Sequence, residues 1–203
     1  MKRNIIWRSQ LAMFGVIVVL ILMCSFSEGQ DKLQERLLQS EGNLKVSKLF
    51  NETPALPTDD REAEIYRMTF IPTFFSPVKI RVERHGEEYE LVAKRLSGQG
   101  GFEVGRLKDE KKRRLKPEEW SRLLALINKA RFWNMPYAEK KIEPNEKGEL
   151  TICLDGSEWV LEGVKDGKFH AVTRYCPDEK PFEEIGQYLA KLSGLKIKQR
   201  ELY

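Results

Sequence analysis

From about Ile65 onward, apolar and polar residues alternate in short runs, which is the pattern of strands with one buried face. The clearest run is Pro77–Arg84, where Val78, Ile80 and Val82 share one face. His85-Gly86 follows as a two-residue turn because glycine readily takes positive φ, and this turn pairs Val82 with Tyr89 and Ile80 with Leu91. Further strands are predicted at Ile65–Ile71, Phe102–Leu107, Glu149–Leu154, Glu158–Val164 and Lys168–Tyr175, with turns at Asp155-Gly156 and Asp166-Gly167.

Two segments instead have the three-to-four-residue apolar spacing of helices. The first begins at Pro117 and runs to about Ala130, and the second is Pro181–Leu192. Proline suits a first helical turn, and each segment also carries two glutamates near its positively polarised N-terminus. The sequence therefore predicts an α+β fold, with an antiparallel sheet of about six to seven strands packed by two helices.

The chain begins with the pattern of a secretory signal. Lys2, Arg3 and Arg8 precede the apolar run Leu11–Cys24, and the small residues of Ser25–Gly29 follow. Three fates fit this pattern: cleavage after Ser27 or Gly29, retention as a membrane anchor, or lipidation at Cys24. We expect residues 1–27 to be a signal peptide or N-terminal anchor, 28–62 a polar linker, and 63–203 the α+β domain. Each fate implies a secreted or periplasmic protein, and retention would associate it with a membrane through residues 5–26.

Charge and cysteine content narrow the picture further. Outside the signal the chain has 32 basic and 31 acidic residues, so a nucleic-acid partner has no electrostatic basis. Cys153 and Cys176 invite a disulfide in an exported protein. The predicted register, however, places them two strands apart, about 9.5 Å, and on opposite faces. We therefore expect these two thiols to remain unpaired, unless a bulge at Cys176, which ends its strand before Pro177, brings them together.

Residues typical of catalysis and metal binding are sparse. The sequence has two histidines and lacks the clustered ligands of a metal site, a nucleophile elbow and a phosphate-binding loop, so no metal or cofactor is expected. His85 occupies a predicted turn, whereas His170 lies on the apolar face of its predicted strand. The run Lys108–Lys116 has six basic residues, which suits either a solvated loop or contact with an anionic membrane surface.

Several segments together resemble a group of exported bacterial proteins of uncharacterised function. They are Trp120-x-x-Leu123-Leu124, Phe132-Trp133-x-x-Pro136, Asp155–Val164 with its Trp-Val-Leu-Glu-Gly-Val sequence, and Gly167–Arg174. The similarity covers roughly Tyr66–Leu195. It implies a small α+β domain behind a bacterial signal peptide and implies no activity. The residues at which it directs a search for a ligand are Trp159, Glu162, Gly163, His170 and Arg174.

These observations favour an exported, non-catalytic domain that binds an unidentified protein or small molecule, or that associates with the cell envelope. The absence of a catalytic constellation in the sequence is the basis for that expectation. The alternative is a periplasmic hydrolase that uses His170 with a carboxylate, although Glu162 of the same region belongs to the opposite face of the predicted strand.

Overall fold

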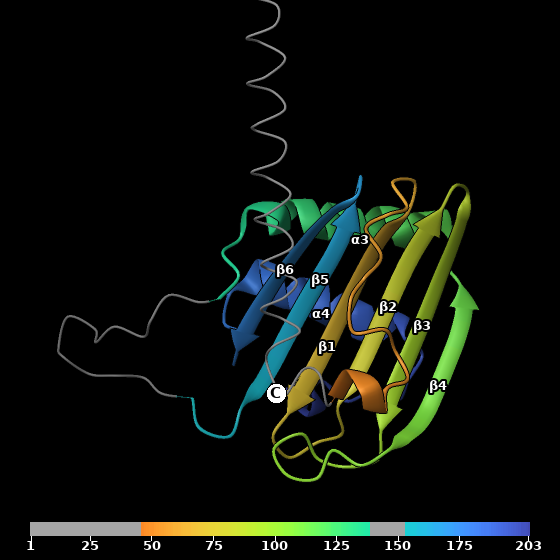
Figure 1. Cartoon of the computed structure of the whole chain (residues 1–203). Coiled ribbons are helices and arrows are strands. Elements are labelled where there is room, and N and C mark those ends of the chain that lie inside the picture. The colour runs from red at the N-terminus through yellow and green to blue at the C-terminus, as the bar shows by residue number, and fades with distance from the viewer. Residues whose placement is uncertain (1–45, 139–152) are drawn as a thin grey trace, which may run out of the picture.

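The computed structural model describes residues 46–138 and 153–203, and these form a six-stranded antiparallel sheet with two helices on one face (Figure 1). The strand order is β4-β3-β2-β1-β5-β6. The strands are β1 Glu64–Pro72, β2 Val78–His85, β3 Glu88–Leu96, β4 Leu107–Arg114, β5 Ser157–Lys165 and β6 Lys168–Tyr175. The helices are α3 Pro117–Lys129 and α4 Lys180–Leu192, with 3-10 turns at Phe132–Asn134 and Gln199–Glu201. The predicted α+β class is confirmed, and both helices lie where the apolar spacing placed them.

The two predicted hairpins differ in how closely the structure follows them. In β5–β6 the predicted pairs Trp159–Arg174 and Leu161–Val172 are confirmed, and Asp166 and Gly167 both take positive φ in the turn. In β2–β3 the predicted register is wrong by two residues, because Val82 pairs with Leu91 rather than Tyr89. The turn is Gly86-Glu87, with His85 paired to Glu88. A two-residue shift keeps every side chain on its predicted face, so the pattern of burial could not detect it.

The basic run Lys108–Lys116 was expected to be a connector after a strand at Phe102–Leu107, and this is wrong. The strand is β4, which starts at Leu107 and contains most of the run at the edge of the sheet. Its charges pair with β3, as in Lys112–Glu90 at 2.8 Å and Arg95–Asp109 at 2.7 Å. Charged side chains are a usual protection of a sheet edge, and they hide the alternating pattern that identifies a strand.

The segment Glu149–Leu154 was expected to pair with the β5 strand, and the structure rules this out. β5 lies between β1 and β6, with Trp159 paired to Phe70 and Arg174, so both of its edges are occupied. Cys153 and Leu154 lie in a loop, and residues 149–152 fall outside the described part of the chain.

The expectation that Cys153 and Cys176 stay unpaired is also wrong: they form a disulfide. Cys153 is not in a strand, and Cys176 leaves the sheet with φ +52° after the last residue of β6. Both departures from the assumed ladder bring the Cα atoms to 6.4 Å, within the range that a disulfide spans. This bond is consistent with a location outside the cytoplasm.

The helix-covered face of the sheet holds the main apolar core. Trp159, Phe70 and Leu161 lie beneath Phe182 and Leu189 of α4, and all five are fully buried. The ring centroids of Phe70 and Trp159 are 4.8 Å apart in an edge-to-face arrangement. Within the described residues, neither α3 nor α4 has the length and apolar character needed to span a membrane.

The second face of the sheet is covered by residues 46–63, which cross it in the foreground of Figure 1. These residues belong largely to the segment expected to be a polar linker, yet Phe50 and Leu56 are fully buried against the sheet. The sequence pattern predicts strands with one buried face, which leaves this second face to solvent, and that is wrong at Val160 and Glu162, which are both buried. The predicted elements included no segment to cover this face.

Candidate functional site

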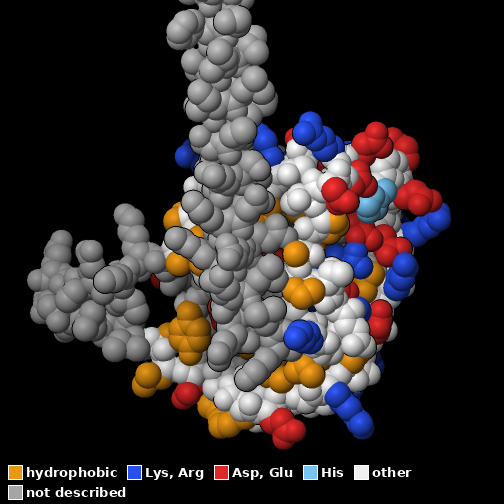
Figure 2. All heavy atoms as spheres, in the orientation of Figure 1, with side chains coloured by type: hydrophobic (Ala, Val, Ile, Leu, Met, Phe, Trp, Pro, Cys, Tyr) orange, Lys and Arg blue, Asp and Glu red, His pale blue; other side chains and the backbone are white. Residues whose placement is uncertain are grey.

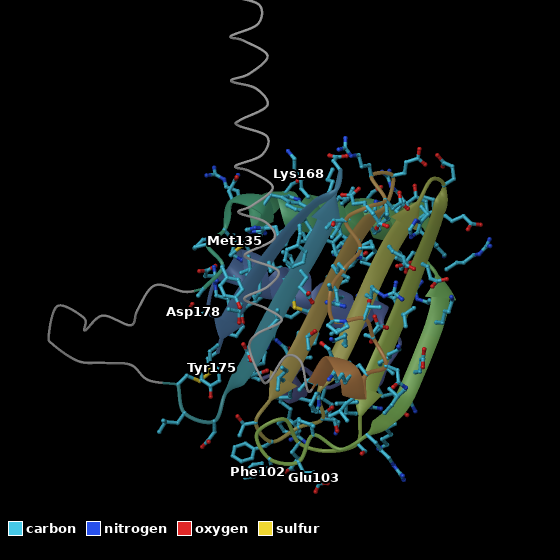
Figure 3. All side chains as sticks on the ribbon, in the orientation of Figure 1. Phe102, Glu103, Met135, Lys168, Tyr175 and Asp178 are labelled. Atoms are coloured by element: carbon cyan, nitrogen blue, oxygen red, sulfur yellow. A yellow bond between two sulfur atoms is a disulfide. The ribbon has the colours of Figure 1, made fainter. Side chains whose placement is uncertain are left out.

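Four large hydrophobic side chains are exposed in the described part of the chain, and all four lie at one end of the sheet. We call this set the apolar end: Phe74 (47% exposed), Phe102 (69%), Leu154 (80%) and Tyr175 (47%). They come from the β1–β2 loop, the β3–β4 loop, the loop before β5 and the last residue of β6. Figure 3 shows Phe102 and Tyr175 at this end, with Lys168 at the opposite end. Hydrophobic atoms gather along the same margin in Figure 2.

Backbone hydrogen bonds join the loops of the apolar end to one another. The amide of Gly100 donates to the carbonyls of Pro72 at 3.0 Å and Phe75 at 3.1 Å. A Cβ at Gly100 would collide with the Pro72 carbonyl, so this close approach requires glycine. The amide of Thr73 in turn donates to the carbonyl of Gly156 at 3.0 Å. The β1–β2 loop therefore holds both of its neighbours, and it brings the rings of Phe74 and Phe102 to 5.9 Å.

The Cys153–Cys176 disulfide fixes the remaining side of the apolar end. It joins the loop that carries Leu154 to the end of β6 that carries Tyr175. The Tyr175 hydroxyl also accepts a hydrogen bond from the amide of Gly156 at 3.0 Å, although its ring is half-exposed. These cross-links hold the four hydrophobic side chains in place without burying them, which is the form expected of a preorganised contact surface.

A second unusual feature, a cluster of buried charges, lies beneath residues 46–63. We call it the charged cluster, and its members are Glu52, Arg67, Lys79, Arg81, Lys94 and Glu162. Arg67 is 1% exposed and donates two hydrogen bonds of 2.6 Å to the Glu162 carboxylate. Its Nη1 donates to the carbonyl of Thr53 at 2.6 Å, and Nη2, which also contacts Glu162, donates to the carbonyl of Pro54 at 2.7 Å. One guanidinium thus ties the covering segment to the centre of the sheet.

The other members of the charged cluster extend this attachment. Lys94 Nζ donates to the Glu52 carboxylate at 2.7 Å, and Arg81 Nε donates to the other oxygen at 3.2 Å. Burial opposes ionisation of Glu52, but the Lys94 hydrogen bond and the charges of Arg81 and Lys94 outweigh it and hold the pKa below its usual range. The Glu52 side chain, itself buried, therefore remains a carboxylate and binds two cations of the sheet.

Lys79 is the member of the charged cluster whose charge is most strongly perturbed. Burial, and then the positive charge of Arg67, lower the pKa of Lys79 to about 7. Its Nζ donates to the Ser47 hydroxyl at 2.9 Å. A serine beside a lysine of depressed pKa is the arrangement of a serine–lysine nucleophile, but Ser47 is buried and no substrate carbonyl could reach it in this conformation. The arrangement serves to fasten the covering segment.

The five residues predicted to bind a ligand separate onto the two faces. Glu162 belongs to the charged cluster, on the face to which the sequence assigned it. On the helix face, Trp159 is fully buried, and its Nε1 donates to the Leu202 carbonyl at 2.8 Å. Gly163 accommodates Phe132, whose ring would lie 2.7 Å from a Cβ at that position. The structure thus brings Trp159 to the C-terminal residues and Gly163 to the segment after α3.

His170 and Arg174 contact that same segment after α3. The imidazole of His170 packs on the rings of Phe132 and Trp133, at centroid distances of 5.0 and 6.0 Å. Burial lowers the pKa of His170. Arg174 donates to the carbonyls of Thr173 at 2.8 Å and Pro136 at 3.2 Å, and it forms an ion pair with Glu179 at 3.4 Å. These contacts hold the residues that follow α3 against the sheet.

A hydrolase based on His170 would need a carboxylate partner for the imidazole. Within residues 46–138 and 153–203 no ion pair is formed by His170, and its buried Nε2 has no hydrogen-bond partner there. The same part of the chain has no group of three His, Cys, Asp or Glu side chains placed to hold a metal ion.

A shallow depression of about 400 Å³ lies between β4, at the edge of the sheet, and the C-terminal segment. Part of its charged lining is already engaged, since Arg95 pairs with Asp109 and Lys111 donates to the Gly194 carbonyl. This leaves the apolar end as the described surface best suited to contact another molecule. Sequence analysis missed it because Phe102 was assigned to a predicted strand, Phe102–Leu107, and Phe74 was not considered as a partner for it. A signal was present, since both lie in proline- or glycine-rich segments where strands end.

No protein-family model matches this sequence, and comparison with curated proteins finds no match.

Proposed function

We propose that this protein is an exported, non-catalytic binding domain associated with the cell envelope, and that its contact surface is the apolar end. The observation that carries the proposal is the gathering of all four exposed large hydrophobic side chains of the described residues at one end of the sheet. Isolated exposed hydrophobic residues are ordinary, but several exposed at one end of a sheet, on loops fixed to one another, are typical of an interaction site.

The structure of the loops supports a binding role further. A loop that only connects strands does not need a disulfide, a glycine at van der Waals contact and several hydrogen bonds between loops. Such restraints reduce the entropy lost when a surface binds. The disulfide also supports the exported location that the N-terminal sequence predicts.

Site-specific photocrosslinking in the producing cell tests the proposal. A photoreactive amino acid replaces Phe102 in one variant and Lys168, at the opposite end, in the matched control (Figure 3). We expect adducts at position 102 that are absent or several-fold weaker at position 168, with mass spectrometry giving the class of the adduct. Equal yields at the two positions, or none at either, would contradict the proposal. A turnover that depends on His170 and survives changes at the apolar end would favour the hydrolase alternative.

A further inference from the structure

We infer that the apolar end docks on the lipid surface of a membrane. This inference rests on the proposed function, because it names the occupant of the same surface. It differs from an attachment by residues 5–26 alone, since it assigns lipid contact to side chains of the folded domain.

The point at which the chain enters the folded domain is the first argument. Val46 is the first described residue, and it packs with Leu96, Ile71 and Leu107. These residues lie at or next to the strand ends from which the loops of Phe74 and Phe102 project. The described part of the chain therefore begins at the end of the sheet that carries the exposed hydrophobic side chains.

The sequence upstream supplies the second argument. The apolar run Leu11–Cys24 enters a membrane whether it acts as a signal or as an anchor. About 20 residues connect it to Val46, and even a fully extended chain of that length spans only about 70 Å. Where the run is retained as an anchor, this connection keeps the apolar end, at which the chain enters the described domain, within about 70 Å of the bilayer.

The chemistry of the apolar end also suits a lipid surface. Phenylalanine and tyrosine partition well into the interfacial region of a bilayer, and leucine into its hydrocarbon. The exposed charges around these loops are of both signs, with Glu103, Arg106 and Asp155 in the loops and Lys108 at the start of β4. Lipid contact should therefore depend on apolar insertion and need no anionic headgroup. In the basic run first considered for a membrane role, Lys112, Arg113 and Arg114 are paired with acidic residues of the protein itself.

Fluorescence quenching by lipids tests this inference. Cys24→Ser leaves the Cys153–Cys176 disulfide and removes the remaining thiol, so that Phe102→Cys or Lys168→Cys can each be labelled alone with an environment-sensitive dye. Each protein, in the form recovered from cells, is combined with phosphatidylcholine vesicles that contain a quencher on the acyl chains. We expect the emission of the label at position 102 to shift to the blue and to be quenched several-fold more than that at position 168, with no change at high salt.

Three outcomes would overturn the inference. The first is quenching at position 102 that is no stronger than at 168. The second is a blue shift without vesicles that grows with protein concentration, which assigns the apolar end to a second copy of the chain. The third is loss of quenching at high salt, which indicates an electrostatic contact. Protein adducts at position 102 in the crosslinking experiment would retain the proposed function while removing the lipid as its partner.

Discussion

Leu161 and Glu162 are neighbours in β5, point to opposite faces of the sheet, and are both buried. Leu161 packs in the apolar core beneath α4, where it needs no specific partner. Glu162 is 6% exposed, and two hydrogen bonds donated by Arg67 offset the cost of removing its carboxylate from water. One face of this sheet is thus covered through the hydrophobic effect, and the other through apolar contacts such as those of Phe50 and Leu56 together with matched buried charges.

The difference shows what each face can specify. Apolar packing tolerates sliding and substitution as long as volume is preserved, whereas a buried charge must meet its own partner. Arg67 contacts Glu162 and the carbonyls of Thr53 and Pro54 at the same time. Residues 46–63 are therefore held in one position across the sheet, and that position brings Val46 to the end where the chain enters.

Among the variants that compare the two faces, removal of Glu162 should lower the free energy of unfolding most. In Glu162→Ala the Arg67 guanidinium stays buried without its carboxylate, and we expect the free energy of unfolding to fall by about 3–5 kcal/mol. Urea denaturation measures this loss. The matched control is Glu158→Ala, on the same strand and face, where a half-buried carboxylate accepts one hydrogen bond from Thr173 and the loss should be about 1 kcal/mol.

The double variant Arg67→Met, Glu162→Leu measures what the intact charged pair contributes to the free energy of unfolding, apart from the penalty of leaving one buried charge without its partner. With both charges gone, stability should return to within about 1 kcal/mol of the wild type, since apolar pairs of similar volume often replace buried ion pairs without loss. A double variant as unstable as Glu162→Ala would show that the two faces do not differ in the way argued here.

The helix face was predictable from the sequence because its side chains follow the strand and helix periods without interruption. Helices α3 and α4 and the β5–β6 register all come from such periodicity together with the Asp166-Gly167 turn. The second face was not predictable, because Arg67, Lys79 and Glu162 alternate like solvent-exposed residues. Their burial depends on residues 46–63, and local sequence pattern does not contain the pairing between distant charges.

The side of the apolar end that carries Leu154 and Tyr175 was not predicted, for a related reason. Asp155-Gly156 matches a hairpin turn in composition, but the strand it was expected to join has no free edge of β5 to pair with. The wrong prediction of unpaired cysteines followed from that error, because the distance between them was taken from a strand pairing that the structure does not contain. Both the position of Leu154 and the disulfide depend on the pairing of β1 with β5 in the middle of the sheet. That pairing joins segments far apart in the sequence, so local pattern does not reveal it.

The pH dependence of stability should also distinguish the faces, through Lys79. Its pKa is about 7 in the folded protein against 10.5 for an ordinary lysine, so the unfolded chain binds more protons between these values. Stability from this residue is therefore absent below pH 7 and increases as the pH rises, by at most about 1.4 kcal/mol per pH unit. Urea denaturation from pH 7 to 9 measures the slope, and Lys79→Met should abolish it. An unchanged slope in that variant would assign the effect to another group.

The smallest expected effect comes from Ile80, which follows Lys79 in β2 and points into the helix-covered core. Ile80→Val removes one buried methylene and should cost about 0.5–1.5 kcal/mol with no change in the pH slope. Because Ile80 and Lys79 lie on opposite faces, the effects of Ile80→Val and Lys79→Met measured by urea denaturation should add to within about 0.5 kcal/mol. A larger interaction energy would mean that the packing of Ile80 on one face depends on the charge of Lys79 on the other. The sheet would then couple the covering segment to α4, and the two faces would be one energetic unit rather than two.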